Sequence, residues 1–588
     1  MKSSFLLSLL TLAYASPHHS HCRCRPHQSC WPSPYDWNTL NRSVEGNLVA
    51  VKPVAAVCHD GGAGSEACQT VQALWSNSTW RATQPGAVQY ENWEAWPEHG
   101  QYCHIETPFD QPCGQGRISL YSTLVRSASD IQKTVRFARK HNLRLAIKNS
   151  GHCFLGRSTA ADSLQILTTG MQDIELVDDF KPDGAPKGHG QGEGPAVTIA
   201  AGVSLQELYS VLADKKRVVV AGAAHTVGTA GGYIQGGGHS FLGPWKGMAS
   251  DNALQFTVVT ADGDLVIANE YRNSDLFWAL RGGGGGTFGV VVDVTLRTFD
   301  EAPVILVNLN ITTALGHPSF WEALTKFHAH LPSLSDAGGA GYYYIIPQLP
   351  WVGNLSISAS TVALMFPNQT DIAEVDRVFA PLLTNLNATS AVTTQYASIV
   401  LPDIKTLISQ VLITGDSDIT GDIVLLGSRL FSRDLLVSED GPERLISALR
   451  NLQWSPGAAA TGHMVAGGAV THNGQVVDSG LHPAWREAAT HITFSHDWDP
   501  NASLAEQKAV QELVNEEVEL LRSVEGPSRM GAYLNEANAY EKDFQTSFWG
   551  SNYPRLYAIK QRWDPTGLFT TRSGVGSEDW DAEGLCRQ

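Results

Sequence analysis

The most constraining feature of this sequence is a glycine-rich stretch from Ala221 to Gly238, which reads AGAAHTVGTAGGYIQGGG. Each of its seven glycines would cost a packed helix or strand about 1 kcal/mol relative to alanine. A second stretch of small residues, from Lys148 to Ser158, follows an apolar run from Leu143 to Ile147. Glycine and serine let main-chain N–H groups approach a ligand, and such concave turns hold anionic groups. The two stretches predict a site for a large, flat, anionic ligand, and the alternative is a pair of mobile surface loops.

The motifs Asn-Ser-Gly-His and Gly-Arg-Ser, followed by Val-Gly-Thr-Ala-Gly-Gly-Tyr-Ile-Gln-Gly-Gly-Gly, carry a resemblance to a known family. They resemble the PCMH-type FAD-binding domain of the vanillyl-alcohol-oxidase superfamily, and within it the berberine-bridge-enzyme-like oxidases, from about Arg117 to Trp580. In that family the loop histidine, His152 here, is bonded to the 8α carbon of the flavin. Many relatives also bond a cysteine to flavin C6, where this chain has Ala224. The resemblance therefore implies FAD held by a single 8α-histidyl link.

The resemblance also implies two groups of residues that contact the flavin besides His152. The group around the histidine is Lys148, Asn149, Ser150, Gly151, Gly156, Arg157 and Ser158. The later group is Gly222, His225, Thr226, Val227, Gly228, Gly231, Gly232, Gly237, Gly238, Gly289, Val290 and Asn552. Of these, His225 either hydrogen-bonds flavin or substrate or merely fills space.

Three motifs near the C-terminus extend the resemblance. They are Tyr-x-Asn at Tyr533, Trp-Gly-x-Asn-Tyr-x-Arg-Leu from Trp549, and Asp-Pro-x-x-x-Phe from Asp564. In berberine-bridge-like enzymes this segment returns the chain to the flavin domain. The ending from Ser573 to Trp580 resembles secreted fungal members related to isoamyl alcohol oxidase.

The catalytic base is less directly indicated. Related oxidases use the tyrosine of Tyr-x-Asn, here Tyr533, sometimes with a carboxylate from a substrate-domain strand. A phenol with a pKa of about 10 needs activation by its neighbours to act at neutral pH. The strand position of that carboxylate falls near His491 and Ile492, where no acid stands. His491 is the candidate substitute, with a buried structural histidine as the alternative, and no metal site is predicted.

A GxGxxG match at Gly284, Gly286 and Gly289 is not a Rossmann fingerprint. That fingerprint needs a strand before it and a helix after it. Here a predicted helix over Asp275–Arg281 precedes the glycines and a predicted strand over Val290–Arg297 follows. The reversed order argues against a nicotinamide-dependent dehydrogenase and favours main chain packed against a flavin.

The predicted fold class is α+β, with a two-subdomain PCMH-type FAD-binding domain and a substrate domain whose antiparallel sheet is covered by helices. The predicted boundaries are a signal peptide 1–15, a Cys-rich extension 16–116, the FAD-binding domain 117–299, the substrate domain 300–525 and a berberine-bridge-like segment 526–588. In the first domain a helix capped at Ser129-Asp130 runs to about His141. The substrate domain is predicted to hold strands over Val304–Ile311, Tyr342–Pro347, Ser356–Phe366 and His491–His496, and helices over Pro318–Leu331, Asp371–Leu383, Asp440–Leu452 and Leu504–Ser523.

The start of the chain predicts secretion. Lys2, the apolar run Phe5–Leu12 and Ala13-Tyr14-Ala15 have the order of a secretory signal peptide. The chain has N-glycosylation sequons at Asn41, Asn77, Asn310, Asn354, Asn368, Asn387 and Asn501. Seven of nine cysteines precede His152, so disulfides should hold together the N-terminal extension, with a zinc site as the rival and Cys153 as the free thiol. The net charge of −17 argues against nucleic acid or an anionic membrane as a partner.

These features predict a secreted FAD-dependent oxidase whose partners are a small-molecule substrate and O2. It would transfer hydride from an alcohol-type substrate to flavin, and O2 would reoxidise the flavin to give H2O2. The alternatives are a tailoring oxidase that acts on a natural product and a non-catalytic secreted glycoprotein that retains the fold.

Overall fold

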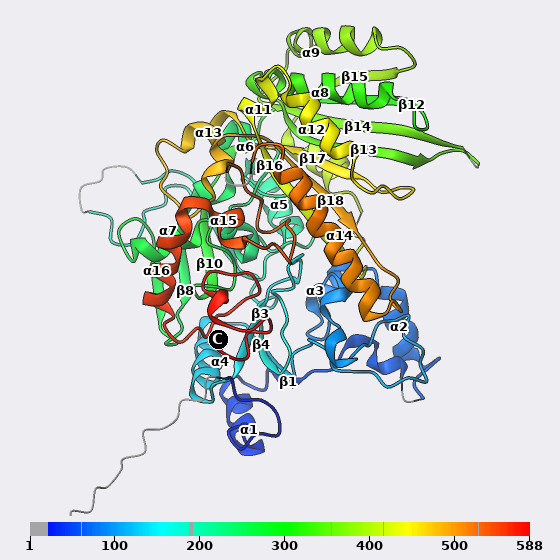
Figure 1. The fold of residues 1–588 in the computed structure, drawn as a ribbon. Helices are drawn as coiled ribbons and strands as arrows, with labels where there is room; N and C mark the ends of the chain where they lie inside the picture. Colours follow the sequence, from blue (N-terminus) through cyan, green and yellow to red (C-terminus); the bar gives the residue numbers. More distant parts are fainter. Residues whose placement is uncertain (1–21, 60, 187–191, 354, 416, 527–528) are drawn as a thin grey trace, which may run out of the picture.

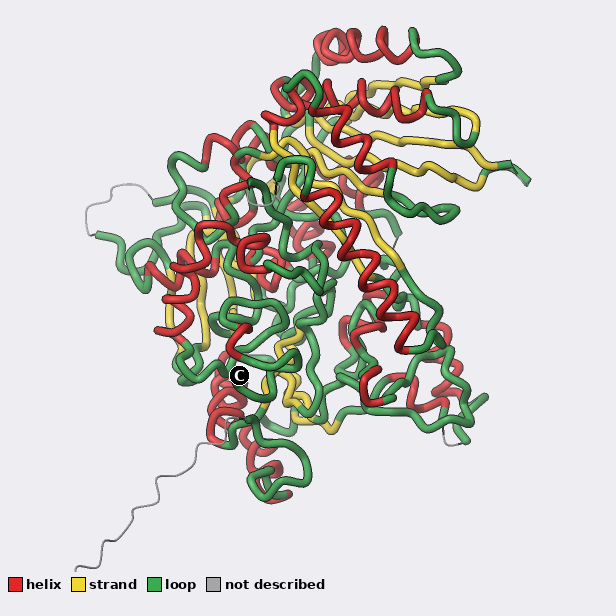
Figure 2. The backbone as a smooth tube through the Cα atoms, in the orientation of Figure 1, coloured by secondary structure: helices red, strands yellow, loops and turns green. Residues whose placement is uncertain are grey.

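The computed structural model describes residues 22–59, 61–186, 192–353, 355–415, 417–526 and 529–588. The predicted signal peptide and Asn354 lie outside these residues. The described chain forms three sheets of four, five and seven strands and one two-stranded pair, with helices packed between and upon them (Figures 1 and 2). This architecture confirms the predicted α+β class.

The first sheet has the order β1-β2-β4-β3 and carries the histidine loop at its edge. Its strands are β1 Leu48–Ala50, β2 Tyr121–Leu124, β3 Arg144–Lys148 and β4 Ser163–Leu167. β4 pairs in parallel with both β2 and β3. Helix α4 (Ala128–Lys140) connects β2 to β3, so that the two strands run in the same direction. The predicted cap of this helix was wrong by two residues, because Ser127 accepts the hydrogen bond from the amide of Asp130.

The second sheet is antiparallel, with the order β5-β6-β10-β8-β9. Its strands are β5 Ile174–Val177, β6 Ala196–Ala200, β8 Ala253–Val259, β9 Leu265–Ala268 and β10 Val290–Arg297. Ser204 forms a capping box with Glu207 at the start of α5 (Leu205–Asp214), as the sequence predicts. The five glycines from Gly282 to Gly286 lie between α7 (Ser274–Leu280) and β10, which confirms the helix–turn–strand order.

The third sheet is antiparallel, with the order β15-β12-β14-β13-β17-β18-β16. Its strands are β12 Val304–Ala314, β13 Ala340–Pro350, β14 Ser356–Pro367, β15 Thr393–Leu401, β16 Leu425–Ser432, β17 Ala460–Met464 and β18 Ala488–His496. Helices α8 Ser319–Asp336, α9 Ile372–Asn387, α12 Gly441–Arg450 and α14 Leu504–Arg522 lie along it (Figure 1). All predicted strands and helices of this region are present, whereas β15, β16 and β17 were not predicted.

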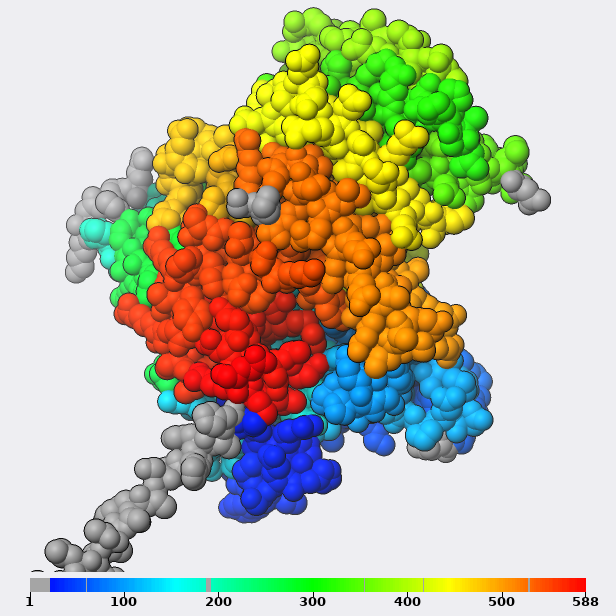
Figure 3. Space-filling view, in the orientation of Figure 1, coloured from blue at the N-terminus to red at the C-terminus, as the bar shows by residue number. Residues whose placement is uncertain are grey.

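The disulfides only partly follow the prediction. Three pairs lie within the N-terminal region, Cys24–Cys30, Cys58–Cys68 and Cys103–Cys113. The fourth, Cys22–Cys586, joins that region to the end of the chain, so the cysteines do not bind the extension only to itself. Figure 3 shows the last residues beside the first described ones. Among the described residues Cys153 is free and buried, as predicted.

One row of paired residues across strands β13, β17 and β18 of the third sheet lies next to the functional region. His463 of β17 lies opposite Tyr342 of β13 and His491 of β18. Neighbours across a sheet face the same side, and successive residues alternate. Thr490 and Tyr343 therefore face α8, where Tyr343 contacts His328, and the two histidines face the flavin-binding half of the molecule. Within the described part of the chain, no helix is both long and apolar enough to span a membrane.

Candidate active site

A cavity of about 430 Å³ lies where several segments meet. Its wall comes from the loop after β3, the glycine-rich stretch, the turn before β10, and a loop around Asp418. The C-terminal segment closes it with Tyr533, Asn535 and Glu536. Segments far apart in the sequence therefore surround one space, as expected for a site that encloses a large ligand.

His152 lies on this wall as a neutral imidazole. Its side chain is 11% exposed, and its Nε2 shares a hydrogen bond of 2.6 Å with Thr226 Oγ1. Burial lowers the pKa of His152 to about 4, although the charge of Asp418 opposes the shift. No partner of Nδ1 is found among the described residues, so this nitrogen has its lone pair or proton available toward the cavity.

Asp418 organises the part of the wall next to His152, with its Oδ2 4.0 Å from the Nε2 of His152, and was missed by sequence reasoning. Its Oδ1 accepts from the Nδ1 of His225 at 2.8 Å, and its carboxylate also accepts from the amides of His225 and Thr226. His225 is thus held by Asp418 and points away from the cavity, whereas Ala224 beside it lines the wall. Asp418 lies between Gly415 and Gly421 in a stretch with no motif that would have revealed its role.

The glycines of the wall are required by close packing. A Cβ at Gly228 would collide with the side chain of Asn149, and one at Gly231 would lie 2.9 Å from its Cγ. Asn149 in turn donates through Nδ2 to the carbonyl of Ala201. Gly232 differs, because a Cβ there would meet no protein atom within 4 Å. The space in front of Gly232 is therefore left to a ligand.

The structure brings thirteen of the predicted site residues to the cavity wall. They are Asn149, Ser150, Gly151, His152, Arg157, Ser158, Val227, Gly228, Gly231, Gly232, Gly289, Val290 and Tyr533. Nine others do not line this cavity. They are Lys148, Gly156, Gly222, His225, Thr226, Gly237, Gly238, His491 and Asn552.

Two of these nine side chains have polar partners elsewhere in the fold. The ammonium of Lys148 is fully buried and donates to the carbonyls of Arg81 and Gln84 at 2.9 and 2.6 Å, and burial lowers its pKa to about 7. The Nδ2 of Asn552 donates to the carbonyl of Leu481 at 2.7 Å. Both side chains donate to main-chain carbonyls of the fold, and neither lines this cavity.

Tyr533 stands at the end of a polar chain on the wall. Its hydroxyl accepts from Asn535 Nδ2 at 2.8 Å, and Asn535 Oδ1 accepts from Arg157 Nη2 at 3.0 Å. Tyr533 is 2% exposed, and burial, followed by the charge of Glu536, raises its pKa. The chain of hydrogen bonds fixes where the phenol oxygen points but does not by itself make it a strong base.

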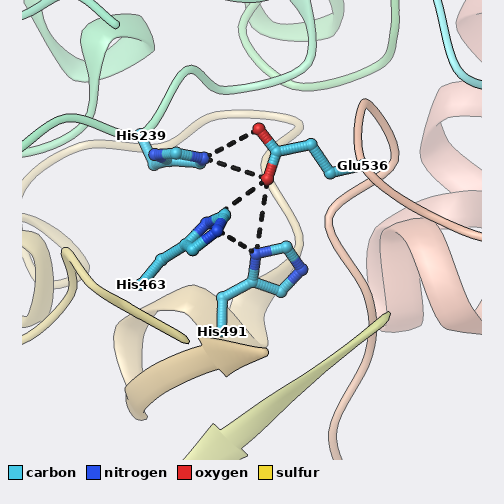
Figure 4. Close-up of side chains that lie close together, drawn as sticks. All are labelled: His239, His463, His491 and Glu536. Carbon is cyan, nitrogen blue, oxygen red and sulfur yellow. Dashed lines mark hydrogen bonds and ion pairs between the residues drawn. The ribbon is translucent and has the colours of Figure 1, made fainter. Parts of the chain in front are cut away.

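Behind Tyr533 lies a group that we name the histidine cluster: His239, His463, His491 and Glu536 (Figure 4). Glu536 faces both the cavity and the three rings. The predicted base candidate His491 is completely buried in this cluster, with its Nδ1 3.6 Å from Glu536 Oε2. The other three residues were missed by sequence reasoning, although Glu536 follows Tyr533 by only three positions.

A largely buried histidine on a glycine-lined cavity, closed by a C-terminal segment, is the arrangement that the motifs predict for a flavoprotein. Residues 121–269 match the family model described as FAD binding domain, and residues 532–576 match the one described as berberine and berberine like. An uncharacterised FAD-linked oxidoreductase of Arthroderma benhamiae is 50% identical over 584 residues, 99% of this chain and 98% of that one. The FAD-linked oxidoreductase malF of Malbranchea aurantiaca is 40% identical over 587 residues, 99% of this chain and 97% of that one.

Solved structures agree. The VAO-type flavoprotein MtVAO615 of Myceliophthora thermophila C1 superposes with a TM-score of 0.84 at 33% identity, covering 96% of this chain and all of that one. A glucooligosaccharide oxidase of Acremonium strictum, with 6-S-cysteinyl, 8α-N1-histidyl FAD, shares the fold at a TM-score of 0.62 and 20% identity, over 81% of this chain and 94% of that one. The chain belongs to the berberine-bridge-enzyme-like FAD-linked oxidoreductases of the vanillyl-alcohol-oxidase superfamily.

Proposed function

We propose that this protein is a secreted oxidase that carries FAD on a single covalent bond to His152. When bound, the flavin accepts a hydride from an alcohol-type substrate and returns the electrons to O2 as H2O2. The observation that carries the proposal is the neutral His152 on the cavity wall. Ala224 on the same wall has no atom that could form a second bond.

The residues present fit a large flat cofactor. The open space in front of Gly232 accepts a ring or ribityl chain, and Gly228 and Gly231 keep Asn149 in place behind it. Thr226 holds the Nε2 of His152, which leaves Nδ1 as the nitrogen for the bond to the flavin. A neutral imidazole presents the lone pair that such a bond needs.

The chain supplies the proton chemistry around the substrate. Tyr533 is the candidate to accept the hydroxyl proton, with Asn535 donating to the phenol oxygen and so favouring its phenolate form. The carboxylate of Glu536, also on the wall, is the second acceptor within this group.

The direct test is flavin attachment in His152→Ala, with His225→Ala as the matched control. Wild-type protein should stay yellow after acid precipitation and yield one flavin peptide that contains His152. His152→Ala should lose all covalent flavin, while His225→Ala, which changes a histidine off the wall, should keep it. A colourless wild-type protein would favour a non-catalytic glycoprotein, and a 6-S-cysteinyl flavin would contradict the single bond.

A second candidate is an oxidase or oxygenase that tailors a larger organic substrate. The observation that favours it is the 40% identity, over 559 residues, 94% of this chain and 98% of that one, to a flavin-dependent oxygenase of Aspergillus ustus. A screen of alcohols, oligosaccharides and phenols for H2O2 release would identify a substrate class. With any active substrate, incorporation of ¹⁸O from labelled O2 into product would support the oxygenase, and its absence with stoichiometric H2O2 would support the oxidase.

Secretion and glycosylation form part of the proposal. Asn368, Asn387 and Asn501 are exposed, and the four described disulfides suit an oxidising compartment. Expression of the full chain in a eukaryotic host should place it in the medium. Enzymatic removal of N-glycans should then lower its mass.

A further inference from the structure

The histidine cluster places four ligand-type atoms around one point. They are the Nε2 of His239, the Nδ1 of His463, the Nδ1 of His491 and a carboxylate oxygen of Glu536, all within 4.8 Å of one another. Figure 4 shows the three rings turned toward the same carboxylate. We propose that this cluster binds one zinc ion, a site that is separate from the flavin attachment and does not depend on it.

The spacing of the atoms is the first support. From Oε2 of Glu536, His239 Nε2 lies at 3.1 Å, His463 Nδ1 at 3.4 Å and His491 Nδ1 at 3.6 Å. The two Nδ1 atoms are 3.4 Å apart. Zinc bonds to nitrogen and oxygen are about 2.0–2.1 Å long, so the ligands of a tetrahedral zinc lie about 3.3–3.4 Å apart. Four of the six distances between ligand atoms therefore already fall close to those of a zinc tetrahedron.

Hydrogen bonding accounts for only part of this arrangement. His239 contacts the two carboxylate oxygens at 3.0 and 3.1 Å, within the ordinary range for an N–H donor. The contacts of His463 and His491 with the carboxylate, and with each other, are longer than the usual N–H···O or N–H···N hydrogen bond. Two imidazole nitrogens that face each other and the same oxygen at this spacing have the arrangement of two ligands of one cation.

The chemistry of the set points to zinc among the divalent metals. Three imidazoles and one carboxylate are the nitrogen and oxygen donors that zinc takes in proteins, and four protein ligands complete a tetrahedral shell. Magnesium and calcium prefer all-oxygen shells of higher coordination number. Because the shell is closed, the expected role is structural rather than catalytic.

The ligands come from four chain segments, which belong to three parts of the fold that the ion would join. His239 follows the glycine-rich stretch of the flavin half, and His463 and His491 sit on neighbouring strands β17 and β18 of the third sheet. Glu536 lies on the C-terminal segment that borders the cavity, and as a zinc ligand it would not serve as the proton acceptor, which would leave that role to Tyr533. The three histidines are at most 7% exposed and the side chain of Glu536 is 24% exposed, so an ion here would be shielded from solvent on the histidine side. A zinc ion would hold sheet, loop and C-terminal segment together beside Tyr533.

The test uses the full-length protein, purified without a metal column, dialysed against metal-free buffer and analysed for all first-row metals. Wild-type protein should retain about one zinc per chain. Extraction of the metal with a strong chelator should lower the unfolding temperature, and added Zn²⁺ should restore it. His463→Ala and the more conservative His463→Asn should each lose this zinc. His496→Ala, a histidine of the same strand as His491 that pairs instead with Glu517, should keep it.

The variant comparison also separates the cluster from the histidines at the start of the chain, His18, His19 and His21, which can bind zinc adventitiously. Zinc that remains in both His463 variants would assign the metal to those residues and overturn the proposal. Wild-type protein that contains no first-row metal and takes up no more Zn²⁺ than His463→Asn would overturn it as well. Neither result bears on flavin attachment, which is scored separately on the same samples by acid precipitation.

Discussion

The cavity wall and the histidine cluster touch at Glu536, yet they are built in opposite ways. Much of the wall is main chain and small residues from two nearly continuous stretches, and its glycines create space. The cluster consists of four side chains from four separate segments, and its rings fill space around one carboxylate. A site made of backbone leaves a local signature in the sequence, whereas a site made of distant side chains is visible only after folding.

The largest expected effect concerns Tyr533, which lies between the two regions, with its ring 5.2 Å from that of His239. If Tyr533 accepts the substrate proton, Tyr533→Phe should slow anaerobic flavin reduction by about 10²–10⁴-fold. The flavin spectrum and the rate of reoxidation by O2 should change little. Tyr343→Phe is the matched control, because that buried tyrosine hydrogen-bonds Thr490 and His328 outside the cavity.

A Tyr533→Phe enzyme that reduces flavin at the wild-type rate would show that the phenol only packs against the cluster. Glu536, whose carboxylate lies on the same wall, would then be the next acceptor to test.

The second prediction concerns the pH dependence of stability and a histidine outside the cluster. His328 lies on α8 and faces the same sheet from the side opposite to the cluster. It contacts Leu324 O at 2.8 Å and Tyr343 Oη at 3.0 Å, and burial lowers its pKa from 6.5 to about 4. Between pH 4 and pH 6.5 the unfolded chain therefore binds more protons at His328 than the folded chain does. The contribution of neutral His328 to the free energy of unfolding is complete above pH 6.5 and is lost as the pH falls toward 4. The loss should reach about 3 kcal/mol.

Chemical denaturation of wild type and His328→Asn at pH 7 and pH 4 measures this loss. The stability advantage of wild type should shrink by that amount as the pH falls. An advantage that is the same at both pH values would mean that His328 does not titrate across folding.

The smallest effect contrasts two glycines of the same wall. Gly228→Ala pushes Asn149 out of its place and should lower the free energy of unfolding by about 1–3 kcal/mol, as overpacking does. Gly232→Ala meets no protein atom and should leave the thermal unfolding of flavin-free protein unchanged while lowering flavin content. Normal flavin content in Gly232→Ala would remove Gly232 from the cofactor site.

The contrast between the two regions also explains how much the sequence predicted. His152 and the glycines were found because their neighbours form contiguous motifs, and β18 was found from its apolar and aromatic residues. Strand β17 was missed because Gly462 interrupts it, although the packed ring of Tyr343 leaves no room there for a side chain. Asp418 and His239 carry no local pattern, and their roles depend on which segments the fold brings together.

Lys148 shows the converse error. Its place beside the flavin loop made it a cofactor candidate, but β3 directs its side chain inward, where two carbonyls accept from it. The position of Lys148 in the sequence correctly placed its main chain near the cavity. The direction of its side chain was decided by β3, in which successive side chains point to opposite faces of the sheet.

The disulfide between Cys22 and Cys586 turns almost the whole described chain into a covalent ring. A protease that cuts this ring once, at any exposed loop between the two cysteines, opens it without releasing a piece. The nicked protein would keep its mass on a non-reducing gel and separate into two fragments only after reduction. A single cleavage therefore releases no segment, and a second cut is needed before any segment can leave.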